Sequence, residues 1–380
     1  MAWSGSAMNI RRSLEASIEH VSVLDKLPVK KHPLHAALRL ALGTAEVDAR
    51  RAPRYPLWAT GPALREFARR TAQAIEQHKP QAVFSISPQC LVYLHEFYKG
   101  ATPVPTFVFS DSTWMAWMEV YKGYYPVPLT AKRFAAQERQ AAKRATGLIY
   151  ASEWAREDAI ARFGVSPDKV YTQPMGASSV PEQSEEEIAA AVHARPHDRV
   201  ELLFVAKEWE RKGGPLALEI ARGLRDSGRV GEVRLNIVGV TPQLAAQDME
   251  LVRLFGLLRR SDAAEAQKLQ ELFLRSHFLV VPTQAECFGL VFAEAQAFAL
   301  PPVSRAVHAL PTVILDGQTG ILQAKEDGPE PYVRRMLALL EGDRSAYEQM
   351  AAAARKHFSE CLNWPAFGRG VTRIIESSLR

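Results

Sequence analysis

Short apolar runs alternate with longer amphipathic stretches along most of the chain. The runs are rich in β-branched residues and show little alternation of apolar and polar positions, which is typical of parallel strands covered on both faces. They predict strands at Val21–Leu24, Ala82–Ile86, Thr106–Phe109, Gly147–Tyr150, Val170–Gln173, Glu201–Val205, Arg234–Val238 and Phe278–Val281. Between them, helical spacing of apolar residues predicts helices at Pro62–Gln77, Ala131–Ala145, Glu153–Phe163, Gly214–Asp226 and Ala263–Arg275. This order of strands and helices predicts a doubly wound α/β fold.

A polar stretch, Ser178–Asp198, separates two such series and predicts a domain boundary. The first domain is expected over residues 1–180 and the second over 195–360, which agrees with a length of 380 residues. The end of the chain is helical throughout. Because its last helix exceeds what the second sheet requires, residues 364–380 are predicted to cross back and complete the first domain.

Composition narrows the class of protein. Hydrophobic residues make up 47% and charged residues 23%, which excludes a disordered, collagen-like or coiled-coil chain. The apolar runs are too short to span a bilayer, and the start of the sequence predicts no secretory signal. Three widely separated cysteines, Cys90, Cys287 and Cys361, argue against an ordinary zinc site or a disulfide framework. We therefore expect a cytoplasmic protein.

Positive charge is concentrated near the start of the chain. Residues 1–80 hold thirteen Lys or Arg and seven Asp or Glu, an excess of six, whereas the whole chain has a net charge of +5. Residues 26–70 are therefore expected to face an anionic partner, such as a phosphorylated substrate or, through peripheral contact, an anionic membrane. A solvated helical face explains the charge equally well. No reader motif accompanies it, so nucleic acid is not an expected partner.

The strongest chemical signal lies between Pro282 and Pro301. Glu286 stands in a loop after a predicted strand, Gly289 marks the start of a helix, and Glu294 lies about one and a half turns into it. Free amides at a helix N-terminus bind anions, and a nearby carboxylate accepts hydrogen bonds from sugar hydroxyls. A capping carboxylate and a surface glutamate explain the spacing alone at least as well.

A second segment, Phe204–Gly214, has a similar position between a strand and a helix. It carries Lys207 and Lys212 in a loop that ends in Gly213 and Gly214. Two lysines in such a loop can converge on one diphosphate, although ordinary loop cations would give the same pattern.

In this order, the two segments resemble the family 4 glycosyltransferases, which have the GT-B fold. Glu286 and Glu294 match the Glu-x7-Glu motif of that family, and Phe288, Gly289 and Leu290 match its Phe-Gly-Leu. Lys212-Gly213 matches a Lys-Gly pair, and Lys207 stands where an Arg is usual. Weaker matches are Leu148–Glu153, Gln173–Gly176, the strand ending at Gly239, and Leu315–Leu322. The resemblance covers residues 145–380 well and 1–145 loosely.

The resemblance implies two Rossmann-like domains and a retaining transfer of a hexose from a UDP- or GDP-sugar. The acceptor would be the hydroxyl of a sugar, a lipid-linked molecule or a small molecule, in the synthesis of polysaccharide, lipopolysaccharide or another glycoconjugate. By analogy, Lys207 and Lys212 neutralise the diphosphate and Glu294 holds the ribose. Glu286 holds the sugar together with the amides of Phe288, Gly289 and Leu290, and Gly239 lies near the base. The chain has no Asp-x-Asp, so we expect no metal and no other cofactor.

Several positions depart from the family pattern. Asp111 stands where the family has a His, and is expected either to contact the sugar or the acceptor or to cap the next helix. His308 lies where Gly-Gly is common, as a ligand contact or a structural residue, and Ala299 replaces a Gly. Gly5 is the candidate contact in an expected loop over Trp3–Asn9, before a helix over 10–18. The family strand before this loop has no counterpart, as in a truncated chain or a shortened sheet.

Two other functions fit the same fold. A catalytically impaired protein that binds nucleotide-sugars or acts as a scaffold would explain the missing strand and the replaced His. A sugar phosphorylase or epimerase would need a different phosphate site and accounts less well for Lys207 and Lys212. The intact carboxylates and lysines favour an enzyme.

Overall fold

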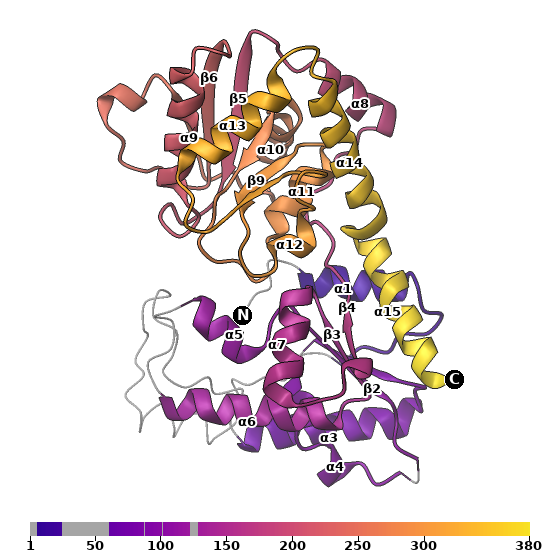
Figure 1. Ribbon diagram of the computed structural model, residues 1–380. Helices are drawn as coiled ribbons and strands as arrows, with labels where there is room; N and C mark the ends of the chain where they lie inside the picture. Colours follow the sequence, from indigo (N-terminus) through magenta and orange to yellow (C-terminus); the bar gives the residue numbers. More distant parts are fainter. Residues whose placement is uncertain (1–5, 25–60, 87, 101, 122–127) are drawn as a thin grey trace. The chain divides into compact units, whose positions relative to one another are not determined.

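The computed structural model describes residues 6–24, 61–86, 88–100, 102–121 and 128–380 (Figure 1). The chain divides into two compact units. Unit 1 is formed by Met1–Asn9 with Pro174–Phe367, and unit 2 by Ile10–Gln173 with Gly368–Arg380. Each unit is built around its own parallel sheet with helices between successive strands, so the predicted α/β class with two domains is confirmed.

Unit 2 contains a four-stranded sheet in sequence order. Its strands are β1 (Val83–Ser85), β2 (Thr106–Ser110), β3 (Gly147–Tyr150) and β4 (Val170–Thr172). Its helices are α3 (Gly61–His78), α4 (Leu94–Phe97), α5 (Trp114–Val120), α6 (Pro128–Arg144) and α7 (Glu153–Phe163), with most of α1 (Ser6–Glu15). Buried alanines of α6 and α7, among them Ala141 and Ala155, pack against Val108 and Leu148 of the sheet. Such small side chains let both helices lie close to the strands.

Unit 1 contains a six-stranded parallel sheet in the order β10-β9-β8-β5-β6-β7. The strands are β5 (Arg199–Val205), β6 (Glu232–Val238), β7 (Val252–Gly256), β8 (Phe278–Val280), β9 (Pro302–Arg305) and β10 (Ile321–Gln323). The helices are α8 (Glu185–His193), α9 (Gly214–Asp226), α10 (Ala263–Arg275), α11 (Leu290–Ala297), α12 (Leu310–Val313), α13 (Pro329–Leu340) and α14 (Ser345–Cys361), with the start of α15 (Trp364–Leu379). The strand order reverses between β5 and β8. In open α/β sheets, ligands bind beyond the carboxyl ends of the strands at such a reversal.

The last helix, α15, is divided between the units at residues 367 and 368. Its part in unit 2 lies against α1 and the end of β4, because Cβ atoms on Gly368 and Gly370 would lie 2.4 Å from the Ser13 carbonyl oxygen and 1.6 Å from Gln173 Oε1. Glycines at both positions make this close approach possible. Among the described residues, no helix has the length and apolar character needed to cross a bilayer.

Some sequence predictions of secondary structure were wrong. Val21–Leu24 is not a strand, because Val23 and Leu24 are 44% and 43% exposed and gain nothing from a sheet. The loop expected over residues 3–9 is helical from Ser6 onward. Three strands were missed. β7 is a half-exposed edge strand, β9 begins with a proline and contains Ser304, and β10 has only three residues.

Candidate active site

The two predicted loops flank the reversal in strand order, since β5 pairs directly with β8. The loop after β5 contacts the loop after β8 through hydrogen bonds to backbone carbonyls. Gln284 N–H donates to the Arg211 carbonyl (2.9 Å), and the Arg211 guanidinium donates to the Ala285 carbonyl (3.0 Å). Gly213 has φ 77°, and a Cβ there would lie 2.0 Å from the Pro282 carbonyl oxygen. The Lys-Gly motif therefore needs its glycine for close contact between the loops.

This contact brings Lys212 and Glu286 together. The Lys212 ammonium forms an ion pair with a Glu286 carboxylate oxygen, and the two side chains are only 15% and 11% exposed. Lys207 behaves differently, because it is exposed and has no hydrogen bond or ion pair with the described residues. The edge of the sheet thus carries one paired cation and one that is available to a ligand.

Helix α11 begins beside this ion pair. Its N-cap is Gly289, with φ 91°, where a Cβ would lie 2.6 Å from the Phe292 ring. Within residues 128–380, the backbone N–H groups of Phe288, Gly289 and Leu290 have no hydrogen-bond acceptor. The Phe288 side chain is buried in the core, so its backbone amide rather than its ring is the group available to a ligand. Unsatisfied amides at a helix N-terminus are an anion site.

Glu294 is the one charged residue of α11, and its side chain is 2% exposed. Both carboxylate oxygens accept a hydrogen bond of 2.6 Å from the guanidinium of Arg260. Burial lowers the pKa of Arg260, but the hydrogen bond to Glu294 and its charge raise it further, so the pKa stays above its usual value. This pair could not be predicted from the sequence, because Arg260 belongs to no motif and lies in the loop after the missed strand β7.

Two further loops border the same edge of unit 1. Gly239, with φ 95°, follows β6 and donates its N–H to the Gly256 carbonyl (2.7 Å). A Cβ on Gly239 would lie 2.4 Å from the Ala206 carbonyl oxygen, so this glycine holds the ends of neighbouring strands together. Gly239 and Arg260 therefore follow the carboxyl ends of β6 and β7, and Gly239 lies next to the start of the Lys207 loop.

His308 follows β9 and has a backbone conformation that residues with a side chain rarely adopt. Its φ is 49°, in the region that favours glycine, and Ala299 has a similar φ of 48°. This explains why glycine is usual at both positions in the resembled family. Burial and the charge of Lys325 lower the pKa of His308, while the charge of Glu286 opposes them. His308 thus lies within the electrostatic reach of the Lys212–Glu286 pair.

Asp111 lies in unit 2, half-buried after the carboxyl end of β2. The predicted capping role belongs instead to Thr113, whose hydroxyl accepts the Ala116 N–H (3.1 Å) at the start of α5. Beside it is a buried acid that the sequence analysis missed. Glu138 accepts the Trp114 N–H through both oxygens (2.9 and 3.1 Å), and burial raises its pKa to about 8.

Other sequence candidates contribute less to a site. Gly5 and residues 26–60 lie outside the described residues. In the rest of the predicted basic region, Arg65 pairs with Glu96, and Arg69 and Arg70 both pair with Glu66. These three arginines are therefore partly neutralised.

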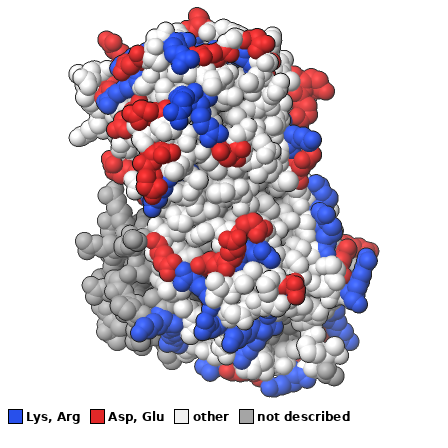
Figure 2. Space-filling view, in the orientation of Figure 1, with Lys and Arg blue, Asp and Glu red and all other residues white. Residues whose placement is uncertain are grey.

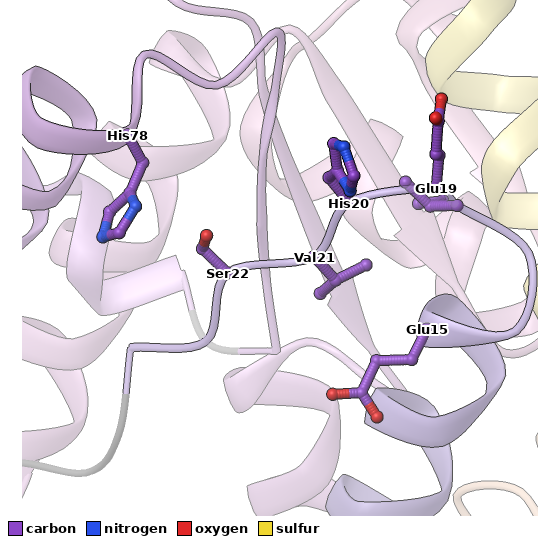
Figure 3. Close-up of a pocket in the computed structure, with 7 residues that line it drawn as sticks. Glu15, Glu19, His20, Val21, Ser22 and His78 are labelled. Carbon is purple, nitrogen blue, oxygen red and sulfur yellow. The ribbon is translucent and has the colours of Figure 1, made fainter.

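An open hollow in unit 2 is lined by Glu15 at the end of α1, by residues of the segment that follows, and by His78 (Figure 3). Its polar side chains do not converge, because Glu15 and Glu19 extend in different directions and His20 and His78 lie apart. Across the described residues, no three His, Cys, Asp or Glu side chains form a group that could hold a metal ion.

Comparison with known families covers both units. Residues 199–342 match the family described as glycosyl transferases group 1, and residues 7–176 match the glycosyl transferase 4-like domain. The chain belongs to the family 4 glycosyltransferases. The matched ranges of this family 4 chain include both loops at the β5/β8 reversal, helix α11 and the Arg260 loop.

One curated relative is D-inositol 3-phosphate glycosyltransferase 1 of Catenulispora acidiphila. It is 28% identical over 208 residues, which make up 52% of this chain and 49% of the relative. The family 4 chain thus spans about half the length of the curated relatives it matches.

Solved structures confirm the GT-B fold of this family 4 chain. A glycosyltransferase from Rickettsia africae has a TM-score of 0.63 at 13% identity, with 100% of this chain and 96% of that chain covered. Anabaena Alr3699/HepE, solved in complex with UDP-glucose, has a TM-score of 0.55 at 14% identity, with 85% and 84% covered.

Proposed function

We propose that this protein is a retaining, metal-independent glycosyltransferase. It would transfer a hexose from a UDP- or GDP-sugar to an acceptor hydroxyl during the synthesis of a cell-surface polysaccharide, lipopolysaccharide or other glycoconjugate. The observation that carries the proposal is the set of unsatisfied amides at Phe288, Gly289 and Leu290 beside the Lys212–Glu286 pair, at the point where the strand order reverses. A solved structure of the same fold holds UDP-glucose, which supports a donor of this class.

The diphosphate of the donor suits the start of α11. Three amide donors and the exposed ammonium of Lys207 supply positive potential, and Lys212 stands next to them. Glu286, partly buried beside Lys212, is placed to accept hydrogen bonds from hydroxyls of the sugar. Glu294, further along α11, suits the ribose. These roles follow the family resemblance and agree with the burial and position of each group.

In the proposed reaction, the bond between the anomeric carbon and the diphosphate oxygen breaks while a bond to the acceptor oxygen forms on the same face. The acceptor proton passes to the departing phosphate oxygen, so atoms and charge balance. Negative charge grows on the diphosphate during this step. Preorganised amides and lysines therefore stabilise the transition state more than the bound donor.

The acceptor is proposed to be anionic. The curated relatives are named for inositol 3-phosphate, and a phosphorylated or lipid-linked acceptor would suit the positive charge of residues 26–70. Helix α6 adds a second basic surface in unit 2, because its acidic residue, Glu138, is buried. Figure 2 shows Lys and Arg side chains gathered in the lower part of the view, where Figure 1 draws α3 and α6. This surface would support peripheral contact with the inner face of the cell membrane.

The purified chain tests the proposal. We expect it to hydrolyse or transfer the sugar of at least one donor among UDP-glucose, GDP-mannose and ADP-glucose, with a rate that survives EDTA because lysines and amides replace the metal. Lost turnover that Mg²⁺ or Mn²⁺ restores would contradict metal independence. A second candidate is a catalytically impaired protein that binds nucleotide-sugars. Tight binding of a donor, with neither hydrolysis nor transfer when cell extracts are added as a source of acceptor, would favour it.

A further inference from the structure

Arg260 forms an ion pair with the carboxylate of Glu294, the group that the proposed function assigns to binding the ribose. Each oxygen of Glu294 accepts a 2.6 Å hydrogen bond from a different nitrogen of the same guanidinium. Such a two-pronged pair is the geometry in which Arg binds carboxylates most strongly. One lone pair on each carboxylate oxygen is thus directed at Arg260, on a side chain that is only 2% exposed.

The side chains of Glu294 and Arg260 differ in how far they are exposed and therefore in how freely they can move. The Glu294 side chain is 2% exposed and belongs to the buried helix α11, whereas the Arg260 side chain is 44% exposed and projects from a turn. That turn is anchored at both ends. Asp262 N–H donates to the Arg259 carbonyl (3.1 Å), Asp262 also caps α10 at Glu265 N–H (3.0 Å), and Arg259 pairs with Glu265 (2.7 Å). The backbone can therefore stay in place while the Arg260 side chain swings into solvent.

We infer that Arg260 is a gate on the ribose site, closed in the absence of nucleotide. The inference rests on the proposed function, since it takes Glu294 as the ribose ligand. With the gate closed, Glu294 is satisfied and its buried charge is compensated. The ribose diol binds only after the guanidinium leaves, so the nucleotide and Arg260 compete for the same carboxylate.

Competition has a measurable consequence. When the binding-competent state is only a fraction of the population, the apparent dissociation constant rises by the inverse of that fraction. A gate that is open about one tenth of the time weakens ribose binding about tenfold. Removing the guanidinium should therefore tighten binding, which is opposite to the effect expected if Arg260 simply held the ligand.

The test uses nucleosides rather than nucleotides, because they carry the ribose without phosphates. Dissociation constants of uridine, guanosine and adenosine are measured by ligand-observed NMR at pH 8, where carboxyl groups are ordinarily ionised. We expect the best-binding nucleoside to bind Arg260→Gln about tenfold more tightly than wild type. Arg260→Lys, which keeps the charge but loses the two-pronged geometry, should fall between them. The 2′,3′-dideoxy form of the same nucleoside, which lacks the diol, should bind all three proteins equally.

Two control variants distinguish failure of the Arg260 gate from failure of the ribose site at Glu294. Arg253→Gln removes one positive charge from exposed surface on β7, where Arg253 has no ion pair with the described residues, and should leave nucleoside binding unchanged. Unchanged or weaker binding of the ribonucleoside to Arg260→Gln would overturn the gate while leaving the ribose site intact. If Glu294→Ala also has no effect, the ribose assignment in the proposed function fails together with the gate.

Discussion

The carboxyl edges of the two sheets carry different kinds of chemistry. In unit 1, charges come in pairs of opposite sign, Lys212 with Glu286 and Arg260 with Glu294, beside unsatisfied amides at Gly289. In unit 2, the corresponding edge carries the half-buried Asp111 and a buried acid, Glu138, under the aromatic helix α5. Under the proposed function, unit 1 would hold the diphosphate and ribose of the donor, which impose the same demands on every donor site and would account for its motifs. An acceptor, proposed to bind unit 2, imposes no such common demand, which would account for the few motifs there.

The buried titratable groups of the two units also differ. His277 in unit 1 accepts the Glu201 N–H at Nδ1 (3.0 Å) and lies 3.0 Å from the Pro196 carbonyl at Nε2, which fixes the neutral tautomer. Burial lowers its pKa to about 3. Glu138 in unit 2 has its pKa raised to about 8, also by burial. Burial therefore makes the stability of unit 1 sensitive to acid, through His277, and the stability of unit 2 sensitive to base, through Glu138.

The largest expected effect is on catalysis by unit 1. Replacing Lys212 by Ala should lower the rate of donor turnover by a factor on the order of 10²–10³, the usual loss for one preorganised charge-stabilising group. The donor dissociation constant should change much less, because charge grows on the diphosphate only in the transition state. Lys207→Ala should act in the same direction. Steady-state kinetics beside direct binding measures both quantities.

Lys268 offers a matched control, since it is an exposed lysine of α10 whose contact is a surface pair with Glu271. Lys268→Ala should turn over like wild type. If the double variant in which both Lys207 and Lys212 are replaced by Ala turns over at the wild-type rate, the diphosphate does not bind at this loop.

Much of unit 1 could be predicted because its signals are local. The predicted helices over Gly214–Asp226 and Ala263–Arg275 agree with α9 and α10, because the periodicity of their apolar residues lies within each segment. Lys212, Glu286 and Gly289 were found through spacing, and the structure brings them together.

Arg260 could not be predicted in this way. Its partner lies 34 residues away, and the ion pair depends on tertiary packing after a strand that itself has no clear pattern. The turn at Leu315–Leu322, in contrast, matches the family and has a structural role. Its Asp316 accepts the Leu322 N–H (2.8 Å) and closes the start of β10. A motif therefore marks what the fold needs as readily as what a ligand needs.

The pH dependence of stability should separate the two units. The folded state holds the Glu138 proton up to about pH 8, while the unfolded carboxyl loses it near 4.5, so the stability of unit 2 falls as pH rises between these values. The unfolded His277 gains a proton near pH 6.5 but the folded one only near 3, so the stability of unit 1 falls as pH drops through that range. Each slope is at most about 1.4 kcal/mol per pH unit.

Hydrogen exchange read by mass spectrometry resolves the units. Glu138→Gln should remove the alkaline loss in unit 2 alone, since the amide oxygen can still accept the Trp114 N–H. His277→Gln should reduce the acid loss in unit 1 alone. An alkaline slope that persists in Glu138→Gln would show that another group titrates.

The smallest expected effect concerns the basic surface of α6. Reversing Lys132 and Lys143, both exposed, to Glu should weaken binding to vesicles containing anionic lipid several-fold, and added salt should weaken wild-type binding in the same way. Sedimentation with anionic and neutral vesicles measures it. The matched control reverses Lys356, an exposed lysine of α14 in unit 1. Equal binding to anionic and neutral vesicles would show that the basic residues of α6 are only a solvated helical face and do not bind a membrane.

The most direct test of the central claim is whether unit 1 is stabilised by a nucleotide-sugar through the residues named here. Thermal unfolding of the wild-type chain is followed with UDP-, GDP- and ADP-sugars, and again for Glu294→Ala. A donor at 100 times its dissociation constant should stabilise the wild type by about 2.7 kcal/mol. Loss of a charged hydrogen bond worth about 1.5–3 kcal/mol should abolish about half or more of that stabilisation in the variant. No stabilisation of the wild type by any of the three donors, or an equal shift in the variant, would contradict the account.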